Sequence, residues 1–227
     1  MSFADVLTTL DAECRLAIVV AAGLADADFS RPTRCPPWDV RVLVGHMVRD
    51  LDRVVTYLEE PAPDSIDTAK TDVVAYWQSY DPKAEGATIT ANSTETADRY
   101  GSPAALVQGL DETLRRCIDR ASAEDPGRIL RTRLTTIRLD EFLKTRVLEI
   151  GVHGLDLADA LGRDPWLTGA AGTVILEILR GLLGDDPSSS LGWSDLVFIE
   201  TGTGRRALTD GERTFLGPRA DAFPLLG

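Results

Sequence analysis

The chemistry open to this chain is limited by its histidines, because the 227 residues contain only two, His46 and His153. Glu149 lies four residues before His153. At about 100° per residue of an α-helix, these two side chains point within about 40° of each other. A carboxylate and an imidazole on one helical face can share a divalent metal ion. Such a pair is also common by chance, so a purely structural role stays open at this point.

Two further polar residues flank this pair on the same predicted helix. Asp156 follows His153 by three residues, so it can accept the second imidazole N–H and fix the tautomer of the ring. Arg146 precedes Glu149 by three residues and can either bond the glutamate or reach an anionic substrate. We therefore take Arg146 and Asp156 as candidate catalytic residues.

The remaining histidine lies at the border of an apolar stripe. His46 follows Leu43 by three residues and immediately precedes Met47. If it points inward across a helix bundle, it completes a set of two histidines and one carboxylate. Three protein ligands with an open position are typical of catalytic zinc sites, whereas structural sites usually have four. A lone histidine at such a border is more often a satisfied interior residue, and this alternative also stays open.

Four long amphipathic segments are expected to position these residues. In each of them, apolar residues recur at steps of three and four. The segments are residues 3–28, about 38–60, 102–123 and 139–161. Four helices of this length are enough for a four-helix bundle.

The connection between the second and third helices, residues 61–101, is long and polar. Only Val73, Val74, Tyr76 and Trp77 suggest a short helix there. A connection of this length suits a crossover between parallel helices of a bundle, or a lid over a site.

The pattern changes beyond Pro165. Residues 168–183 predict a fifth helix, whereas 195–200 and 205–209 read as two strands joined by a hairpin turn. We therefore expect a mainly α protein, with a bundle domain over residues 1–165 and a small α+β appendage over 166–227.

Composition excludes several classes of function. The chain has 24 basic and 36 acidic residues, a formal net charge of −12, which argues against nucleic acid as a partner. Its three cysteines do not suggest a disulfide framework: Cys14 and Cys117 lie on apolar stripes, and Cys35 precedes two prolines before His46. Neither a signal peptide nor a membrane-spanning segment is evident, so we expect a cytoplasmic protein without a membrane partner.

Two segments resemble the signatures of mycothiol-dependent maleylpyruvate isomerase-like proteins, which belong to the DinB-like superfamily of metal-binding four-helix bundles. Residues 34–46, Arg-Cys-Pro-Pro-Trp-Asp-Val-Arg-Val-Leu-Val-Gly-His, resemble the entry into the second helix of these proteins. Residues 146–157, with Arg, Glu, His and Asp at their family spacing, resemble the fourth. The resemblance implies that His46, Glu149 and His153 bind a divalent metal, usually taken as zinc.

This resemblance covers roughly residues 5–165 and also implies an activity. The metal would hold mycothiol, a low-molecular-weight thiol cosubstrate, as a thiolate for S-transfer or addition to a small electrophilic or anionic substrate. Cis–trans isomerisation of the maleylpyruvate type is the narrower possibility. An arginine in the C-terminal domain of the family has been linked to catalysis. The sequence does not separate four candidates for it: Arg205, Arg206, Arg213 and Arg219.

Of these arginines we assign Arg205 to the cofactor-binding residues, together with Trp38, whose alternative role is packing. The C-terminal region is shorter than is usual in the family's isomerases. Two other functions stay open: a non-catalytic protein that binds or sequesters a small molecule or metal, and a metal-dependent hydrolase. The chain is expected to be a monomer or a homodimer.

Overall fold

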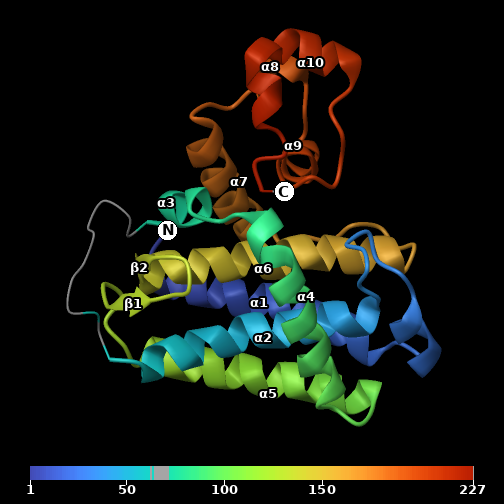
Figure 1. Cartoon of the computed structure of the whole chain (residues 1–227), viewed down its shortest axis with the longest axis vertical. Helices are drawn as coiled ribbons and strands as arrows, with labels where there is room; N and C mark the ends of the chain where they lie inside the picture. Colours follow the sequence, from blue (N-terminus) through green and yellow to red (C-terminus); the bar gives the residue numbers. More distant parts are fainter. Residues whose placement is uncertain (62, 64–71, 227) are drawn as a thin grey trace.

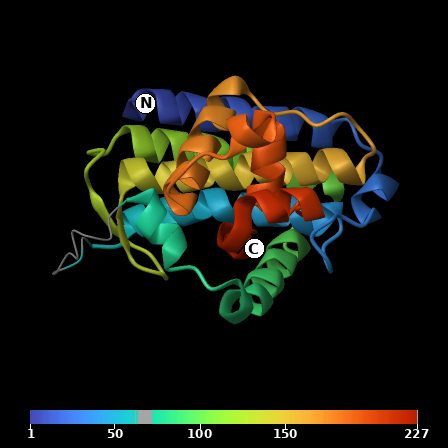
Figure 2. The same cartoon turned by 90° about the horizontal axis from the view of Figure 1, so that it is seen from above.

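Four long helices lie side by side and form a bundle (Figures 1 and 2). They are α1 (Phe3–Ala22), α2 (Val40–Glu59), α5 (Pro103–Ser122) and α6 (Leu139–Ala160). This computed structural model describes residues 1–61, 63 and 72–226. Helix α2 packs against α5 and α6, and α1 packs against the same two helices. The mainly α class and the bundle predicted from sequence are confirmed.

The apolar stripes explain why these segments fold as they do. Leu10 of α1, Leu43 and Met47 of α2, Leu110 of α5 and Phe142 of α6 are fully buried in one core. Removing such side chains from water is the main stabilising contribution to the bundle.

Side-chain caps set where three of the helices begin. Ser2, Asp39 and Ser102 each accept a hydrogen bond from a backbone N–H of the first turn. The first helix ends at Ala22, earlier than the predicted residue 28, and is followed by a 3-10 turn, η1 (Asp26–Ser30).

The crossover between α2 and α5 contains more helix than the sequence suggested. Helix α3 (Val73–Gln78) was expected, but α4 (Pro82–Asp98) was not. Few residues of α4 are buried, Ser93, Thr96 and Ala97, so it has no broad apolar stripe to detect. It packs against α2 and crosses the bundle in Figure 1 from the level of α6 to that of α5. Residues 62 and 64–71 of the crossover lie outside the described residues.

Two short strands precede α6. Strands β1 (Ile129–Arg131) and β2 (Thr136–Arg138) pair antiparallel, and Leu130 lies opposite Ile137 in the core. The residues that the structure describes form no other strands, so the small sheet belongs to the bundle part of the chain and not to the C-terminal region.

The C-terminal region is helical rather than α+β. It contains α7 (Gly169–Leu183), α8 (Ser188–Leu191), α9 (Asp195–Gly202), α10 (Asp210–Leu216) and the 3-10 turn η3 (Gly217–Ala222). The predicted strand at 195–200 is wrong because this segment forms α9, and 205–209 is irregular. Ser194 caps α9, and Phe198 and Ile199 are buried where α9 packs on α7. Tertiary packing has therefore overridden the β propensity of an apolar run.

The C-terminal helices stand on one side of the bundle, and the chain then turns back toward it (Figure 1). Helix α7 contacts α6, α1 and α3, and its buried side chains belong to the same apolar cluster as the bundle core. The backbone N–H groups of Leu225 and Leu226 donate to the carbonyl of Gly202. No helix among the described residues is both long and apolar enough to cross a membrane. The domain boundary at residue 165 stays a prediction.

Candidate metal centre

Three potential metal ligands converge between α2 and α6. Glu149 Oε2 lies 3.5 Å from His46 Nε2 and 3.3 Å from His153 Nε2. The three side chains each offer one donor atom, and these atoms all lie within 4.8 Å of one another. The structure therefore brings together the three residues that the sequence singled out as ligands.

Each histidine is held by its other ring nitrogen. His153 Nδ1 lies 2.8 Å from Asp156 Oδ2, and His46 Nδ1 lies 3.1 Å from Ser93 Oγ. The hydroxyl of Ser93 donates to the carbonyl of Ile89 at 2.8 Å, so its oxygen is left to accept from His46 Nδ1–H. In the neutral tautomer that a metal ligand requires, with the proton on Nδ1, each Nε2 lone pair would point at the glutamate.

In that tautomer two lone pairs and a carboxylate repel one another, so the centre needs a cation, either a metal ion or a proton that turns an imidazole Nε2 into an N–H donor. Burial opposes ionisation of Glu149, but hydrogen bonds with His153 and His46 outweigh it and hold the pKa of the carboxyl well below its ordinary value. Burial also opposes the charge on His153, but hydrogen bonds with Asp156, Cys35 and Glu149 raise the pKa of this imidazole well above its ordinary value. A proton or a divalent metal ion satisfies this centre, and the donor set of two imidazoles and a carboxylate fits the metal.

Asp156 is the anchor of His153. It is fully buried and accepts hydrogen bonds from Arg34 Nε at 2.8 Å and from Arg205 Nε at 3.0 Å and Nη2 at 2.7 Å. Burial opposes its ionisation, but hydrogen bonds with His153 and Arg205 outweigh this and hold the pKa of Asp156 far below its ordinary value. Two guanidinium groups thus keep the residue as a carboxylate that orients the imidazole.

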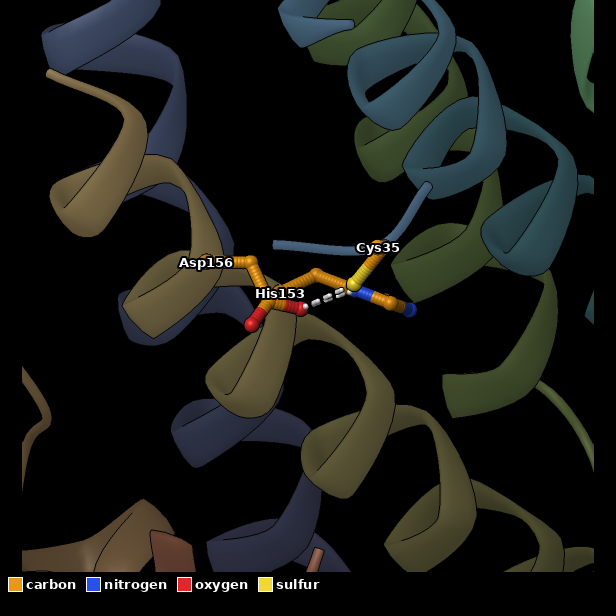
Figure 3. Close-up of side chains that lie close together, drawn as sticks. All are labelled: Cys35, His153 and Asp156. Atoms are coloured by element: carbon orange, nitrogen blue, oxygen red, sulfur yellow. Dashed lines mark hydrogen bonds and ion pairs between the residues drawn. The ribbon is translucent and has the colours of Figure 1, made fainter. Parts of the chain in front are cut away.

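Cys35 also reaches this carboxylate, as Figure 3 shows. Its Sγ donates to Asp156 Oδ2 at 3.1 Å, the same oxygen that His153 Nδ1 contacts. In a catalytic triad the imidazole stands between the nucleophile and the acid. Here the thiol and the acid share one side of the ring, which does not match a cysteine protease-like triad.

Arg146 lies on α6, one turn before the candidate ligand Glu149. It is buried, and its Nη1 is 3.0 Å from Asp50 Oδ1, so it pairs with neither Glu149 nor the cavity wall. Asp50 itself was missed by sequence reasoning. The signal was present, because Asp50 follows His46 by four residues, the same spacing that links Glu149 and His153.

A cavity of about 400 Å³ opens onto the three ligands. Its walls combine aromatic and aliphatic side chains, including Trp77, Tyr80, Ile89 and Val152. Trp38 is part of this wall: its ring centroid lies 4.7 Å from that of His46, and its Nε1 donates to Thr90 Oγ1 at 3.0 Å. The missed helix α4 thus supplies both Thr90 and Ser93, which hold Trp38 and His46.

The C-terminal region contributes the remaining wall through Thr203, Arg205 and Leu226. Of the four arginines that the sequence could not separate, only Arg205 lines this cavity among the described residues. Besides its two bonds to Asp156, its Nη1 donates to the carbonyl of Thr203 at 2.6 Å. Burial opposes its charge, but hydrogen bonding to Asp156 outweighs this and raises the pKa of Arg205 above its ordinary value.

The other arginines of the C-terminal region lie elsewhere. Arg206 pairs with Glu212, Arg219 pairs with Asp185, and Arg213 is exposed on α10. Arg205 is therefore the cationic side chain from this region that stands at the cavity.

Comparison with known families bears on the chain as a whole. The family model for the mycothiol maleylpyruvate isomerase N-terminal domain matches residues 10–158, more than half of the chain. The chain belongs to this family. The match includes every candidate ligand and ends two residues after Asp156, so Arg205 and the rest of the C-terminal wall lie outside it. No curated protein and no solved structure matched the chain.

Proposed function

We propose that this member of the family is a metal-dependent enzyme that uses a low-molecular-weight thiol, mycothiol, as cosubstrate. The reaction would be S-transfer or addition of the thiol to a small electrophilic substrate, with maleylpyruvate-type cis–trans isomerisation as a narrower case. The observation that supports the proposal is the convergence of His46 Nε2, Glu149 Oε2 and His153 Nε2 on a single cavity of about 400 Å³. That volume suits a small-molecule ligand.

His46, Glu149 and His153 would hold the metal, with zinc the expected ion. When bound, a divalent metal lowers the pKa of a thiol or water in its open position, which supplies a nucleophile near neutral pH. Both histidines would be committed as ligands. A proton released at the site would therefore have to pass to solvent or to a carboxylate.

The other site residues position and shield the reacting groups. Asp156 fixes the His153 ring through Nδ1, and Arg205 in turn fixes Asp156. The donors of Arg205 are directed to Asp156 and Thr203, so we propose that it acts through Asp156 and through the positive charge it places at the cavity wall. Trp38 and its aromatic neighbours limit access of water, which strengthens electrostatic interactions inside the cavity.

Arg146 is proposed as a positioning residue, because it contacts Asp50 rather than the cavity. Its charge, buried one turn below the ligands, offsets part of the negative charge of the two carboxylates around His46.

The test is a His153→Ala variant, with exposed Asp159→Ala near the end of the same helix as the control. Elemental analysis should find about one divalent metal per wild-type and control chain, and a large loss of metal in His153→Ala. Thiol-dependent turnover of a panel of electrophiles should disappear with the metal, while circular dichroism shows a retained helical fold. Stoichiometric metal in His153→Ala would contradict the ligand assignment. Metal without thiol-dependent turnover in the wild type would favour a binding protein instead of an enzyme.

A further inference from the structure

Tyr80 lies in the wall of the cavity that opens onto the candidate ligands, in the turn between α3 and α4. Its side chain is half-buried, and its hydroxyl group forms no hydrogen bond with the part of the chain that the structure describes. A phenol can donate one hydrogen bond. Tyr80 therefore has a donor to offer to a molecule in the cavity.

Other donors of this wall are already engaged within the protein. The thiol of Cys35 donates to Asp156, and the nitrogens of Arg205 donate to Asp156 and to the carbonyl of Thr203. The hydroxyl of Thr203 donates to the carbonyl of Ile199 at 2.7 Å. Among the described residues of the wall, the Tyr80 hydroxyl is thus an acidic group whose proton has no acceptor in the protein.

A chain of edge-to-face aromatic pairs links Tyr80 to the core. Phe142 is fully buried, and its ring centroid lies 6.0 Å from that of Tyr76. The centroids of Tyr76 and Trp77 are 5.5 Å apart, and those of Trp77 and Tyr80 are 5.6 Å apart, with interplanar angles of 86° and 90°. Such pairs are favourable beyond the area they bury. The core thus fixes where the Tyr80 ring stands in the wall.

The surroundings of Tyr80 keep its hydroxyl protonated. Burial and the negative charge of nearby Glu149 raise the pKa of the Tyr80 phenol above its ordinary value. At neutral pH the group is therefore a hydrogen-bond donor and does not act as a base.

We propose that Tyr80 is a further catalytic residue, which donates its O–H to a carbonyl oxygen of the electrophile. The inference rests on the proposed function and narrows the substrate to conjugated carbonyl compounds, in which a C=C bond is attached to a C=O group. Such an oxygen gains negative charge during thiol addition, and a donor placed at that charge stabilises the transition state more than the ground state.

The addition step balances without an oxidant or reductant. The thiolate sulfur forms a C–S bond with the far carbon of the C=C bond. The π electrons of this bond move toward the carbonyl, and negative charge develops on its oxygen, where Tyr80 donates. The carbon next to the carbonyl then takes a proton from solvent, which replaces the proton that the thiol released.

The experiment compares Tyr80→Phe with Tyr57→Phe in the full-length, metal-loaded chain. Tyr57 is also half-buried and packs edge-on against Phe142, but it does not line the cavity, so its variant loses the same hydroxyl outside the site. Turnover with mycothiol is measured for two electrophiles. Cyclohexenone is a conjugated ketone, whereas benzyl chloride loses chloride by substitution and develops no charge on oxygen.

Tyr80→Phe is expected to lower kcat for cyclohexenone about 100-fold with little change in KM, as for loss of one donor to a developing oxyanion. Its metal content and its turnover of benzyl chloride should match those of the wild type and of Tyr57→Phe. Unchanged turnover of cyclohexenone would overturn the inference. So would equal losses with both electrophiles, or a loss of metal, because Tyr80 would then only shape the cavity or support the metal centre.

A second measurement needs neither metal nor turnover. Cyclohexanone, a ketone without the C=C bond, is added to metal-free protein, and its C=O stretching band is recorded by infrared difference spectroscopy. The band of the bound ketone should lie at higher wavenumber in Tyr80→Phe than in the wild type and Tyr57→Phe, because a hydrogen bond lowers this frequency. The same band in all three proteins overturns the inference. If the band shifts as expected but the metal-loaded wild type turns over neither electrophile, the proposed function is refuted, and the catalytic role of Tyr80 with it, while its contact with a carbonyl stands.

Discussion

Replacing Asp156 by asparagine tests how strongly the site depends on its anchor. The carboxylate receives five contacts, and all of them come from donors: Arg34, two nitrogens of Arg205, His153 and Cys35. An amide of the same shape offers one acceptor oxygen and one NH₂ group. Whichever way it is oriented, at least two of these donors face an N–H instead of an oxygen.

The magnitude follows from the burial of the group. Breaking a buried ion pair by removing one partner costs about 3–5 kcal/mol. Arg34 and Arg205 are 21% and 17% exposed, and Arg34 keeps Glu200 as a partner at 3.1 Å, so the lower end of this range applies. We expect Asp156→Asn to lower the free energy of unfolding by about 3 kcal/mol, and Tm by about 6–12 °C for a chain of this size. Metal affinity should fall about 10–100-fold, because His153 loses its orienting acceptor.

Thermal unfolding followed by circular dichroism measures the first effect, in metal-free protein so that binding does not contribute. Competition with a chromophoric chelator measures the second. Asp159→Asn, on an exposed face of the same helix, is the matched control and should change neither quantity. If Asp156→Asn binds metal as tightly as the wild type and melts at the same temperature, Asp156 does not anchor His153 and the account of the site is wrong.

Two further predictions concern packing and thiol access. A methyl group at Gly45 would approach Ala97 Cβ and the Ser93 carbonyl to 2.8 Å, so Gly45→Ala should separate α2 from α4 and cost about 1–3 kcal/mol in denaturant unfolding. Gly86→Ala on α4, with nothing within 4 Å, should instead stabilise by up to about 1 kcal/mol, and equal effects of the two substitutions would contradict this packing. Burial raises the pKa of the Cys117 thiol to about 12 and that of Cys14 further, so each should be about 0.01% thiolate or less at pH 8. Alkylation monitored by mass spectrometry should therefore label only Cys35 in the native protein, and all three thiols after unfolding. Rapid labelling of Cys14 or Cys117 in the native protein would contradict their burial.

The helices of the bundle could be predicted because each carries its own evidence. In α1, α2, α5 and α6 the apolar residues repeat with the period of an α-helix, and the buried faces are the ones this period selects. Helix α4 lacks that pattern. It is held by tertiary contacts such as that of Ala97 with Gly45, which exist only once α2 is in place.

The prediction of two strands in the C-terminal region was wrong for a related reason. Residues 195–200 are a short apolar run between polar ends, and such a run fits a strand or a buried helix equally well. The Ser194 cap and the packing of Phe198 on α7 decided for the helix. The periodicity of so short a run contains too little information to make that choice.

The sequence by itself determined which side chains are available for metal chemistry. Two histidines among 227 residues leave few combinations, and the four-residue spacing of Glu149 and His153 acts within one helix, where geometry is local. Only the tertiary structure decided their partners. Ser93 from α4 contacts the ligand His46, and Arg34 and Arg205, from segments far apart in the chain, contact Asp156, which orients His153. Helix packing brings these residues together. These hydrogen bonds join residues 47, 122 and 49 positions apart, and a contact at such a separation leaves no periodic trace in the sequence, so the packed fold alone decides it.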